Sequence, residues 1–315
     1  MLGCMIHSYA DRDIGTCLSS KRMVFIGDSV TRQLYFQMAH TLDATLPAAP
    51  TDDERKHVDY ELTTTQNVRL SFVWDPFLNT SNALAFTRPL TPFDTPTSSD
   101  IDTPSLLVLG SGLWYLRYAD ASGGLPVWEA MMERHLENLS TSRRRAADLV
   151  VVLPVENVVQ AKLSPERAST MQPSDIDAMN SDLAHRIRPP SLLDPFAFFV
   201  PPAGPISATI PSVFNEMLDP SQTDDGLHFS ASVVKMQAKI LLNLLCNEKL
   251  PKVYPFDSTC CRRYPWPAPV HLLVLGGLLV WGPLCWFLAR RYSEWGRLLL
   301  PRRATNHRNR SKDTR

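Results

Sequence analysis

The chain has 315 residues, of which 44% are hydrophobic, and it contains 32 basic and 32 acidic residues. This length allows one domain with a full hydrophobic core and one additional segment. The balanced charge, and the lack of a basic stripe with interleaved aromatic residues in the body of the chain, exclude nucleic acid as a partner class.

The first predicted elements lead to a sharp strand-to-helix turn. Residues 1–20 are predicted to be an extended lead-in that carries Cys4 and Cys17. An apolar strand follows at residues 21–26, and an amphipathic helix at residues 29–46. Only residues 27 and 28 remain to connect the strand to the helix, so the chain must change from extended to helical conformation within a tight turn.

That turn contains Gly27, Asp28 and Ser29. It places Ser29 at the carboxyl end of a strand and at a helix N-terminus, where backbone N–H groups and the helix dipole favour an oxyanion. Ser29 is therefore a candidate nucleophile, although it could equally serve only as a helix cap. Arg32 lies one turn later on the same face, followed by Gln33; a solvated surface charge is the alternative for Arg32.

Short apolar strands then alternate with helices. Strands are predicted at residues 60–62, 68–74, 105–109, 149–153 and 196–200, and helices at residues 127–148, 174–187, 213–218 and 230–246. Residues 88–104 are rich in Pro, Thr, Ser and Asp, which is typical of a surface insertion. This alternation predicts an α/β domain over residues 21–250, built on a parallel sheet whose site lies at the carboxyl ends of the strands.

Two strand ends carry further candidates, and one helix carries a histidine. Gly110 and Gly112 follow the strand at 105–109, where glycine lets backbone N–H groups approach a substrate closely; a simple turn is the alternative. Asn157 follows the next strand. His135, in the helix at 127–148, is expected to be a half-buried surface residue.

A candidate base and its orienting group occur near the end of the domain. Asp225 and His228 lie three residues apart in the sequence DGLH. A serine hydroxyl becomes nucleophilic when a histidine takes its proton and a third group holds that histidine in one tautomer. A hydrogen-bonded core histidine is the alternative for His228, but together with Ser29 the pattern favours a catalytic triad.

These motifs resemble a known family. GDSVTRQL at residues 27–34 and DGLH at 225–228 are similar to SGNH (GDSL-type) esterases, and more narrowly to the PC-esterase branch. The closest resemblance, over residues 3–266, is to the lumenal domain of fungal capsule-polysaccharide and animal sialic-acid O-acetyltransferases. It implies a three-layer SGNH fold and oxyanion donors at Ser29 and at Gly110 or Gly112. Asn157 would be a further donor, although it lacks the usual Gly-x-Asn-Asp context.

The cysteines at the edges of the body favour disulfides in an oxidising compartment. The candidates are Cys4, Cys17, Cys246, Cys260 and Cys261. Because five is an odd number, at least one thiol stays free or pairs outside the chain. No metal site is expected, since no C-x-x-C pattern or nearby histidine supports a four-ligand zinc site.

The C-terminal part is predicted to enter a membrane. After a Pro- and Cys-containing linker at 251–269, residues 270–289 contain no Asp, Glu, Lys or Arg, and twenty such residues span a bilayer as a helix. Residues 290–315 hold nine basic residues, which indicates a cytoplasmic tail. A buried core helix is the alternative for 270–289, but its glycines are better tolerated in a membrane.

A cytoplasmic tail places the body in the lumen of the secretory pathway, with the Golgi as the expected compartment. Asn79 and Asn138 begin potential glycosylation sequons in that body. Residues 1–4 offer no apolar signal region, so we expect the chain to be an incomplete product of a longer gene. The alternative is a tail-anchored protein with a cytosolic body.

The sequence thus predicts a membrane-anchored carbohydrate O-acetyltransferase that acts on a glycan acceptor through a Ser-His-Asp acyl-enzyme. A sugar O-acetylesterase is the runner-up, because the same triad delivers the acetyl group to water instead. A non-catalytic carbohydrate-binding membrane protein is the third hypothesis. No bound cofactor is expected, and acetyl-CoA is the acetyl source if a multi-span membrane module accompanies the domain.

Overall fold

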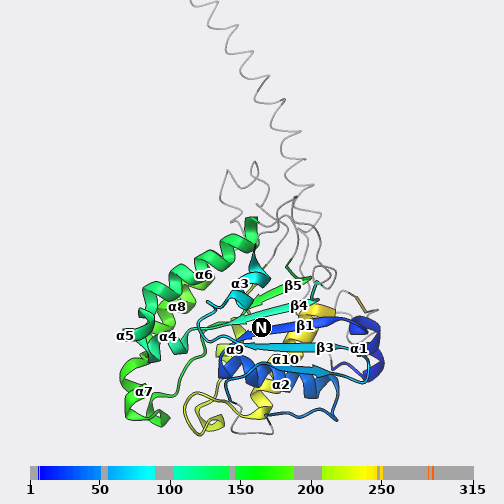
Figure 1. Ribbon diagram of the computed structural model, residues 1–315, viewed down its shortest axis with the longest axis horizontal. Coiled ribbons are helices and arrows are strands. Elements are labelled where there is room, and N and C mark those ends of the chain that lie inside the picture. The colour runs from blue at the N-terminus through cyan, green and yellow to red at the C-terminus, as the bar shows by residue number, and fades with distance from the viewer. Residues whose placement is uncertain are drawn as a thin grey trace, which may run out of the picture. The chain divides into compact units, whose positions relative to one another are not determined.

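A computed structural model of the chain is shown in Figure 1. It describes residues 6, 8–50, 56–88, 103–141, 146–187, 208–246, 249–250, 283 and 286. The chain divides into two compact units, Met1–Arg262 and Arg263–Arg315. Of the second unit the structure describes only Pro283 and Trp286, so the fold presented here is that of the first unit.

The first unit alternates strands with helices along most of its described length. The strands are β1 (Arg22–Gly27), β2 (Tyr60–Thr63), β3 (Arg69–Trp74), β4 (Leu106–Gly110), β5 (Leu149–Val152) and β6 (Ala208–Thr209). The helices are α1 (Asp11–Leu18), α2 (Ser29–Leu42), α3 (Ser81–Thr87), α4 (Leu113–Arg117), α5 (Ala119–Ser122), α6 (Gly124–Thr141), α7 (Pro165–Thr170), α8 (Pro173–Arg186), α9 (Val213–Glu216) and α10 (Ala231–Cys246), with 3-10 turns at Gln160–Lys162 and Pro220–Gln222.

The six strands form one mixed sheet in the order β2-β3-β1-β4-β5-β6. This confirms the predicted α/β class, with β1 and β4 at the centre and parallel to each other. The prediction of a wholly parallel sheet is wrong at β2, which is antiparallel to β3. The cause is a short turn in which the Thr64 N–H donates to the Val68 carbonyl at 3.0 Å. A parallel return would need a crossover of a dozen or more residues.

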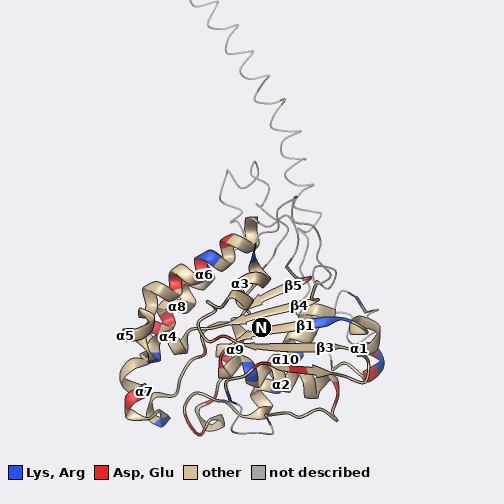
Figure 2. Ribbon diagram, in the orientation of Figure 1, with Lys and Arg blue, Asp and Glu red and all other residues tan. Residues whose placement is uncertain are grey.

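Helices cover both faces of the sheet, because side chains alternate between faces along each strand. Met23 and Phe25 of β1 pack with α1, α2 and α10, whereas Val24 and Ile26 pack with α3, α4, α6 and α8. Figure 1 shows α2 and α10 on one side of the sheet and α6 and α8 on the other. Charged residues lie on outer helices such as α6 and α7 and are absent from β4 and β5 (Figure 2). The result is a sheet buried between two helical layers.

The predicted extended lead-in is corrected by helix α1. Ile14, Cys17 and Leu18 are buried and share one face of this helix at helical spacing. Eight residues form too short a helix to be stable alone, so packing rather than intrinsic propensity holds it in place. A propensity argument applied to this segment alone therefore misses the helix.

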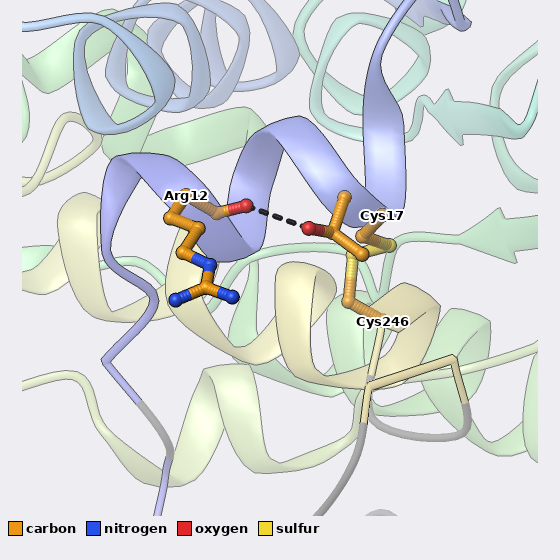
Figure 3. The surroundings of a disulfide bond; sticks show 4 residues. Arg12, Cys17 and Cys246 are labelled. Carbon is orange, nitrogen blue, oxygen red and sulfur yellow. Dashed lines mark hydrogen bonds between the residues drawn. A yellow bond between two sulfur atoms is a disulfide. The ribbon is translucent and has the colours of Figure 1, made fainter.

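A disulfide joins α1 to the last helix of the domain, α10 (Figure 3). It links Cys17 to Cys246, which are 229 residues apart in sequence. Two of the five predicted disulfide candidates are therefore paired. Cys4, Cys260 and Cys261 lie outside the described residues.

Two further predictions on helices are corrected. Helix α2 ends at Leu42 rather than near residue 46, because Asp43 is extended and its carboxylate accepts the backbone N–H of Thr45. His135 is fully buried rather than half-buried. Its ring nitrogens lie 2.8 Å from Thr87 Oγ1 and 2.7 Å from the Leu78 carbonyl, and burial lowers its pKa. His135 thus ties α6 to the segment around α3.

Several predictions concern segments outside the described residues. These are the strand at 196–200, most of the insertion at 88–104, the whole linker at 251–269, most of the apolar segment at 270–289, and the basic tail at 290–315. Within the described ranges, no helix is both long enough and apolar enough to cross a bilayer.

Candidate active site

The candidate nucleophile lies where β1 turns into α2. Asp28 is the N-cap of α2, and its Oδ1 accepts the backbone N–H groups of Val30 at 3.0 Å and Thr31 at 3.4 Å. Ser29 is the first helical residue and is half-buried. The Asp28 carboxylate thus performs the capping role that the sequence left open for Ser29, and the Ser29 hydroxyl is engaged elsewhere.

Glycines allow this turn to pack directly on the neighbouring strand end. Gly27 of β1 is paired with Gly110 of β4. A Cβ atom at either position would collide with the Thr31 side chain, so only glycine lets α2 begin this close to β4. Gly112 precedes α4, and a Cβ atom at this position would collide with the Val155 side chain.

The candidate base is held in a turn stabilised by its own acid. Asp225 Oδ1 accepts the backbone N–H groups of Leu227 at 2.9 Å and His228 at 2.8 Å. Gly226 adopts a φ of +77°, a conformation that favours glycine, and its carbonyl accepts the Val159 N–H. The turn is therefore fixed both internally and against the loop that follows β5.

The structure brings Ser29, His228 and Asp225 into one hydrogen-bonded chain. His228 Nε2 lies 2.9 Å from Ser29 Oγ, and His228 Nδ1 lies 2.7 Å from Asp225 Oδ2. An ionised Asp225 accepts only, so Nδ1 carries the hydrogen and Nε2 is left to accept the serine proton. A nucleophile, a base and an orienting acid need this geometry.

Asp225 is kept ionised by its surroundings. Burial alone would raise its pKa, but the hydrogen bonds from the His228 backbone, the His228 ring and the Leu227 N–H outweigh that effect, and its pKa is lowered. Arg167 Nη1 also lies 3.8 Å from Asp225 Oδ2. Asp225 can therefore hold the protonated imidazole that forms during proton transfer.

The triad opens into a cleft of about 590 Å³. Besides Ser29, Asp225 and His228, the cleft is lined by side chains from α2, α4, α7 and α10 and by the segments at 48–50 and 56–57. Its charged and aromatic lining residues include Arg32, Lys56, His57, Trp114, Arg117 and Arg167. A small polar molecule can thus reach Ser29.

Of the remaining predicted site residues, some line the cleft and others do not. Arg32 and Gln33 both line the cleft, and the Arg32 guanidinium lies 5.7 Å from the centre of the Trp74 ring. Gly110 ends β4 and Gly112 is the N-cap of α4, and neither is among the cleft-lining residues. Asn157 is exposed, and its backbone N–H donates to Asn215 Oδ1 at 3.1 Å. All four predicted oxyanion donors, Ser29 included, therefore stay predictions.

Sequence reasoning missed four residues near the triad. Arg117 and Arg167 come from short helices whose sequences carry no motif, and only the fold brings them to the cleft. His57 stacks on Trp74 with ring centres 4.4 Å apart and lines the cleft as well. Glu156 follows β5 and is buried at 7% exposure. Its position at a strand end was the one available signal.

The two predicted glycosylation sequons differ in exposure. Asn79 is exposed and lies in the loop before α3, whereas Asn138 is half-buried within α6. Only Asn79 has the surface-loop setting that is expected of an acceptor.

Comparisons with known proteins agree with the family resemblance. No family model matches the chain. The chain is similar to the N-acetylneuraminate (7)9-O-acetyltransferase of Danio rerio, with 23% identity over 283 residues, covering 88% of this chain. The match covers 32% of that protein, so this chain spans a minor part of its relative's length.

Among solved structures, a catalytic mutant of an acetylxylan esterase from Geobacillus stearothermophilus matches with a TM-score of 0.39 and 11% identity. This alignment covers 72% of this chain and 94% of the esterase chain, and a likeness at that level carries no argument. The transferase relative supports the resemblance to GDSL/PC-esterase-like proteins that the two motifs indicate.

Proposed function

We propose that the chain is an SGNH-type serine enzyme that transfers acetyl groups to, or removes them from, sugar hydroxyls. The observation that carries this proposal is the hydrogen-bonded chain from Ser29 Oγ through His228 to Asp225, which faces a cleft. The acetyl chemistry is supported by the relative, whose name describes O-acetyl transfer to N-acetylneuraminate.

The proposed reaction proceeds in two balanced halves. Ser29 Oγ attacks the acetyl carbonyl carbon while His228 Nε2 takes its proton, and the oxyanion faces the N-terminus of α2. His228 then protonates the departing group, which leaves an acetyl ester on Ser29. In the second half an acceptor hydroxyl attacks the ester carbonyl carbon and passes its proton to His228. His228 then returns that proton to Ser29 Oγ as the bond between Oγ and the acetyl carbon breaks, which restores neutral His228 and free Ser29.

Transferase and esterase differ only in whether the acceptor is a sugar hydroxyl or water. We favour the transferase, because the curated relative bears that activity in its name. Acetyl-CoA is the proposed acetyl source if a multi-span membrane module accompanies the domain. An esterase is the second candidate, since the same groups serve both reactions.

The proposed acceptor is an anionic sugar. Four Arg or Lys side chains line the described cleft, namely Arg32, Lys56, Arg117 and Arg167, against the carboxylates of Asp28 and Asp225. Guanidinium groups bind carboxylates through paired, charge-assisted hydrogen bonds. Trp114 adds an aromatic face on which a sugar ring can pack.

We further propose that the body lies in the secretory lumen, anchored by residues 270–289. The basic residues after position 289 support a cytoplasmic tail. The Cys17–Cys246 disulfide supports an oxidising compartment.

The test is turnover of an aryl acetate and of an O-acetylated sialic acid by the full chain in detergent. We expect Ser29→Ala and His228→Ala each to lower kcat by about 10³-fold or more. Asp225→Asn should lower kcat strongly as well. Two control variants at exposed positions, Asp224→Asn beside Asp225 and Ser181→Ala in α8, should leave kcat unchanged. Wild-type turnover by Ser29→Ala would reject the proposal, and glycan binding without turnover would favour the carbohydrate-binding alternative.

A further inference from the structure

A buried carboxyl group that the triad does not use lies beside the nucleophile turn. Glu156 follows the carboxyl end of β5 and is 7% exposed. Its Oε2 atom is buried and has no hydrogen-bond partner among the described residues. A buried polar atom without a partner costs free energy, so its retention calls for a physical reason.

A small cavity connects Glu156 to the N-cap of α2. It measures about 20 Å³ and is lined by Glu156 and Asp28 together with Gly110, Ser111 and Val155. One water molecule needs about 10–15 Å³ of such space and two or more polar partners. The two carboxyl groups and the neighbouring backbone supply those partners, so the cavity suits a single bound water.

Two buried carboxyl groups that line one small cavity do not both ionise near neutral pH, because like charges in a dry site repel strongly. Burial raises the pKa of Asp28 to about 6, although the N–H groups of Thr31 and Val30 and the charge of His228 act to lower it. Burial, then the charges of Asp28 and Asp225, raise the pKa of Glu156 well above its usual range. Asp28 has the hydrogen bonds that favour a carboxylate, so Glu156 holds the proton.

We propose that Glu156 is a positioning residue of the active site, whose protonated carboxyl donates a hydrogen bond, through one water molecule in this cavity, to Asp28. The inference rests on the proposed function in so far as it concerns catalysis. Glu156 would act on Ser29 indirectly. It would hold Asp28 in place, and the Asp28 carboxylate accepts the backbone N–H groups of Val30 and Thr31, which fixes the turn that holds Ser29.

Loss of the Glu156 proton would place a second negative charge against Asp28. The charged and titratable groups facing the pair are Asp225 and His228, from the turn at residues 225–228. The cavity-lining residues of β4 and of the segment after β5 include no titratable side chain besides Glu156 itself. Repulsion would then push Asp28 away from its capping position and displace Ser29 from His228. Activity should therefore fall at alkaline pH for a reason separate from the triad.

The test compares Glu156→Gln with Glu156→Leu and uses Glu216→Gln, at an exposed position of α9, as the matched control. Glutamine keeps the donor and the shape but cannot ionise, so it should retain neutral-pH kcat within about 3-fold and lose the alkaline decline. Leucine removes the donor, so it should lower kcat by about 10-fold with little change in KM for an aryl acetate. The control should behave as the wild type.

Thermal unfolding against pH gives a readout that needs no catalysis. A carboxyl group whose pKa is raised in the folded state stabilises at low pH and loses that contribution as pH rises through the raised value. The wild type should therefore lose stability with rising pH more steeply than Glu156→Gln. This difference should remain even if Ser29→Ala shows that the proposed function is wrong.

Three results would overturn the inference. Glu156→Gln could lose as much kcat as Glu156→Leu, which would mean that a negative charge is required. Both variants could match the wild type, which would remove the positioning role. An unchanged stability profile in Glu156→Gln would show that Glu156 is not the ionising group, and this result can be read even if Glu156→Leu does not fold.

Discussion

Arg117 is the single residue at which acceptor recognition can be separated most cleanly from chemistry. Its guanidinium lines the cleft, stacks 5.0 Å from the Tyr118 ring centre and lies 3.6 Å from Glu166. In the part of the chain that the structure describes, its contacts are with Glu166 and Tyr118 rather than with the triad, whereas Arg167 Nη1 lies 3.8 Å from Asp225 Oδ2. If Arg117 pairs with the negative charge of the acceptor, its replacement should weaken binding of an anionic sugar far more than it slows acyl transfer.

Arg117→Gln should raise KM for an acetylated sugar acid by about 3- to 10-fold, as expected for one charge-assisted hydrogen bond. KM for a neutral aryl acetate should stay unchanged. Steady-state kinetics with both substrates provide the measurement, and Arg134→Gln, at an exposed position of α6, provides the control. An equal change for both substrates would contradict a role in anion recognition.

The same residues show what sequence alone could predict at this scale. Ser29, Asp225 and His228 were identified because local motifs contain them, and the structure brings them together although 199 residues separate Ser29 from His228. Arg117, Arg167 and Glu156 carry no local motif. Only the fold brings the two arginines to the cleft and Glu156 beside the turn at residues 27–29, so the sequence alone does not identify them.

At the scale of elements, the covalent link between α1 and α10 invites a direct test. The Cys17–Cys246 bond closes a long loop, and such a cross-link mainly restricts the unfolded chain. Replacing both cysteines by alanine should lower the free energy of unfolding by about 2–5 kcal/mol. Denaturant unfolding measures this change.

A reducing agent supplies the control for that experiment. It should lower the stability of the wild type toward that of the double variant and leave the double variant unchanged. Equal unfolding midpoints for oxidised wild type and double variant would contradict a stabilising role for the bond.

The strands and long helices were predictable because their apolar residues recur with a clear period, as in β1, β4 and α10. Helix α1 was missed because eight residues give too little periodicity and its stability comes from tertiary packing. The direction of β2 was missed for a different reason. Strand pairing depends on the length of the connecting turn, which the apolar pattern does not reveal.

At the scale of the whole molecule, the proposed lumenal setting predicts which sequon is used. Asn79 lies exposed in a loop, whereas Asn138 is half-buried in α6. When the chain is directed into the secretory pathway, a glycosidase-sensitive mass shift should disappear in Asn79→Gln and persist in Asn138→Gln. Absence of any shift in the wild type would count against lumenal exposure of Asn79.

The central claim is that Ser29 carries the acetyl group during turnover. Its most direct test is mass spectrometry of the full chain, quenched during turnover of an aryl acetate and digested to peptides. The account predicts one acetyl group on the peptide that contains Ser29, reduced to background in Ser29→Ala. Continued turnover without acetylation of Ser29, or acetylation confined to another residue, would contradict it.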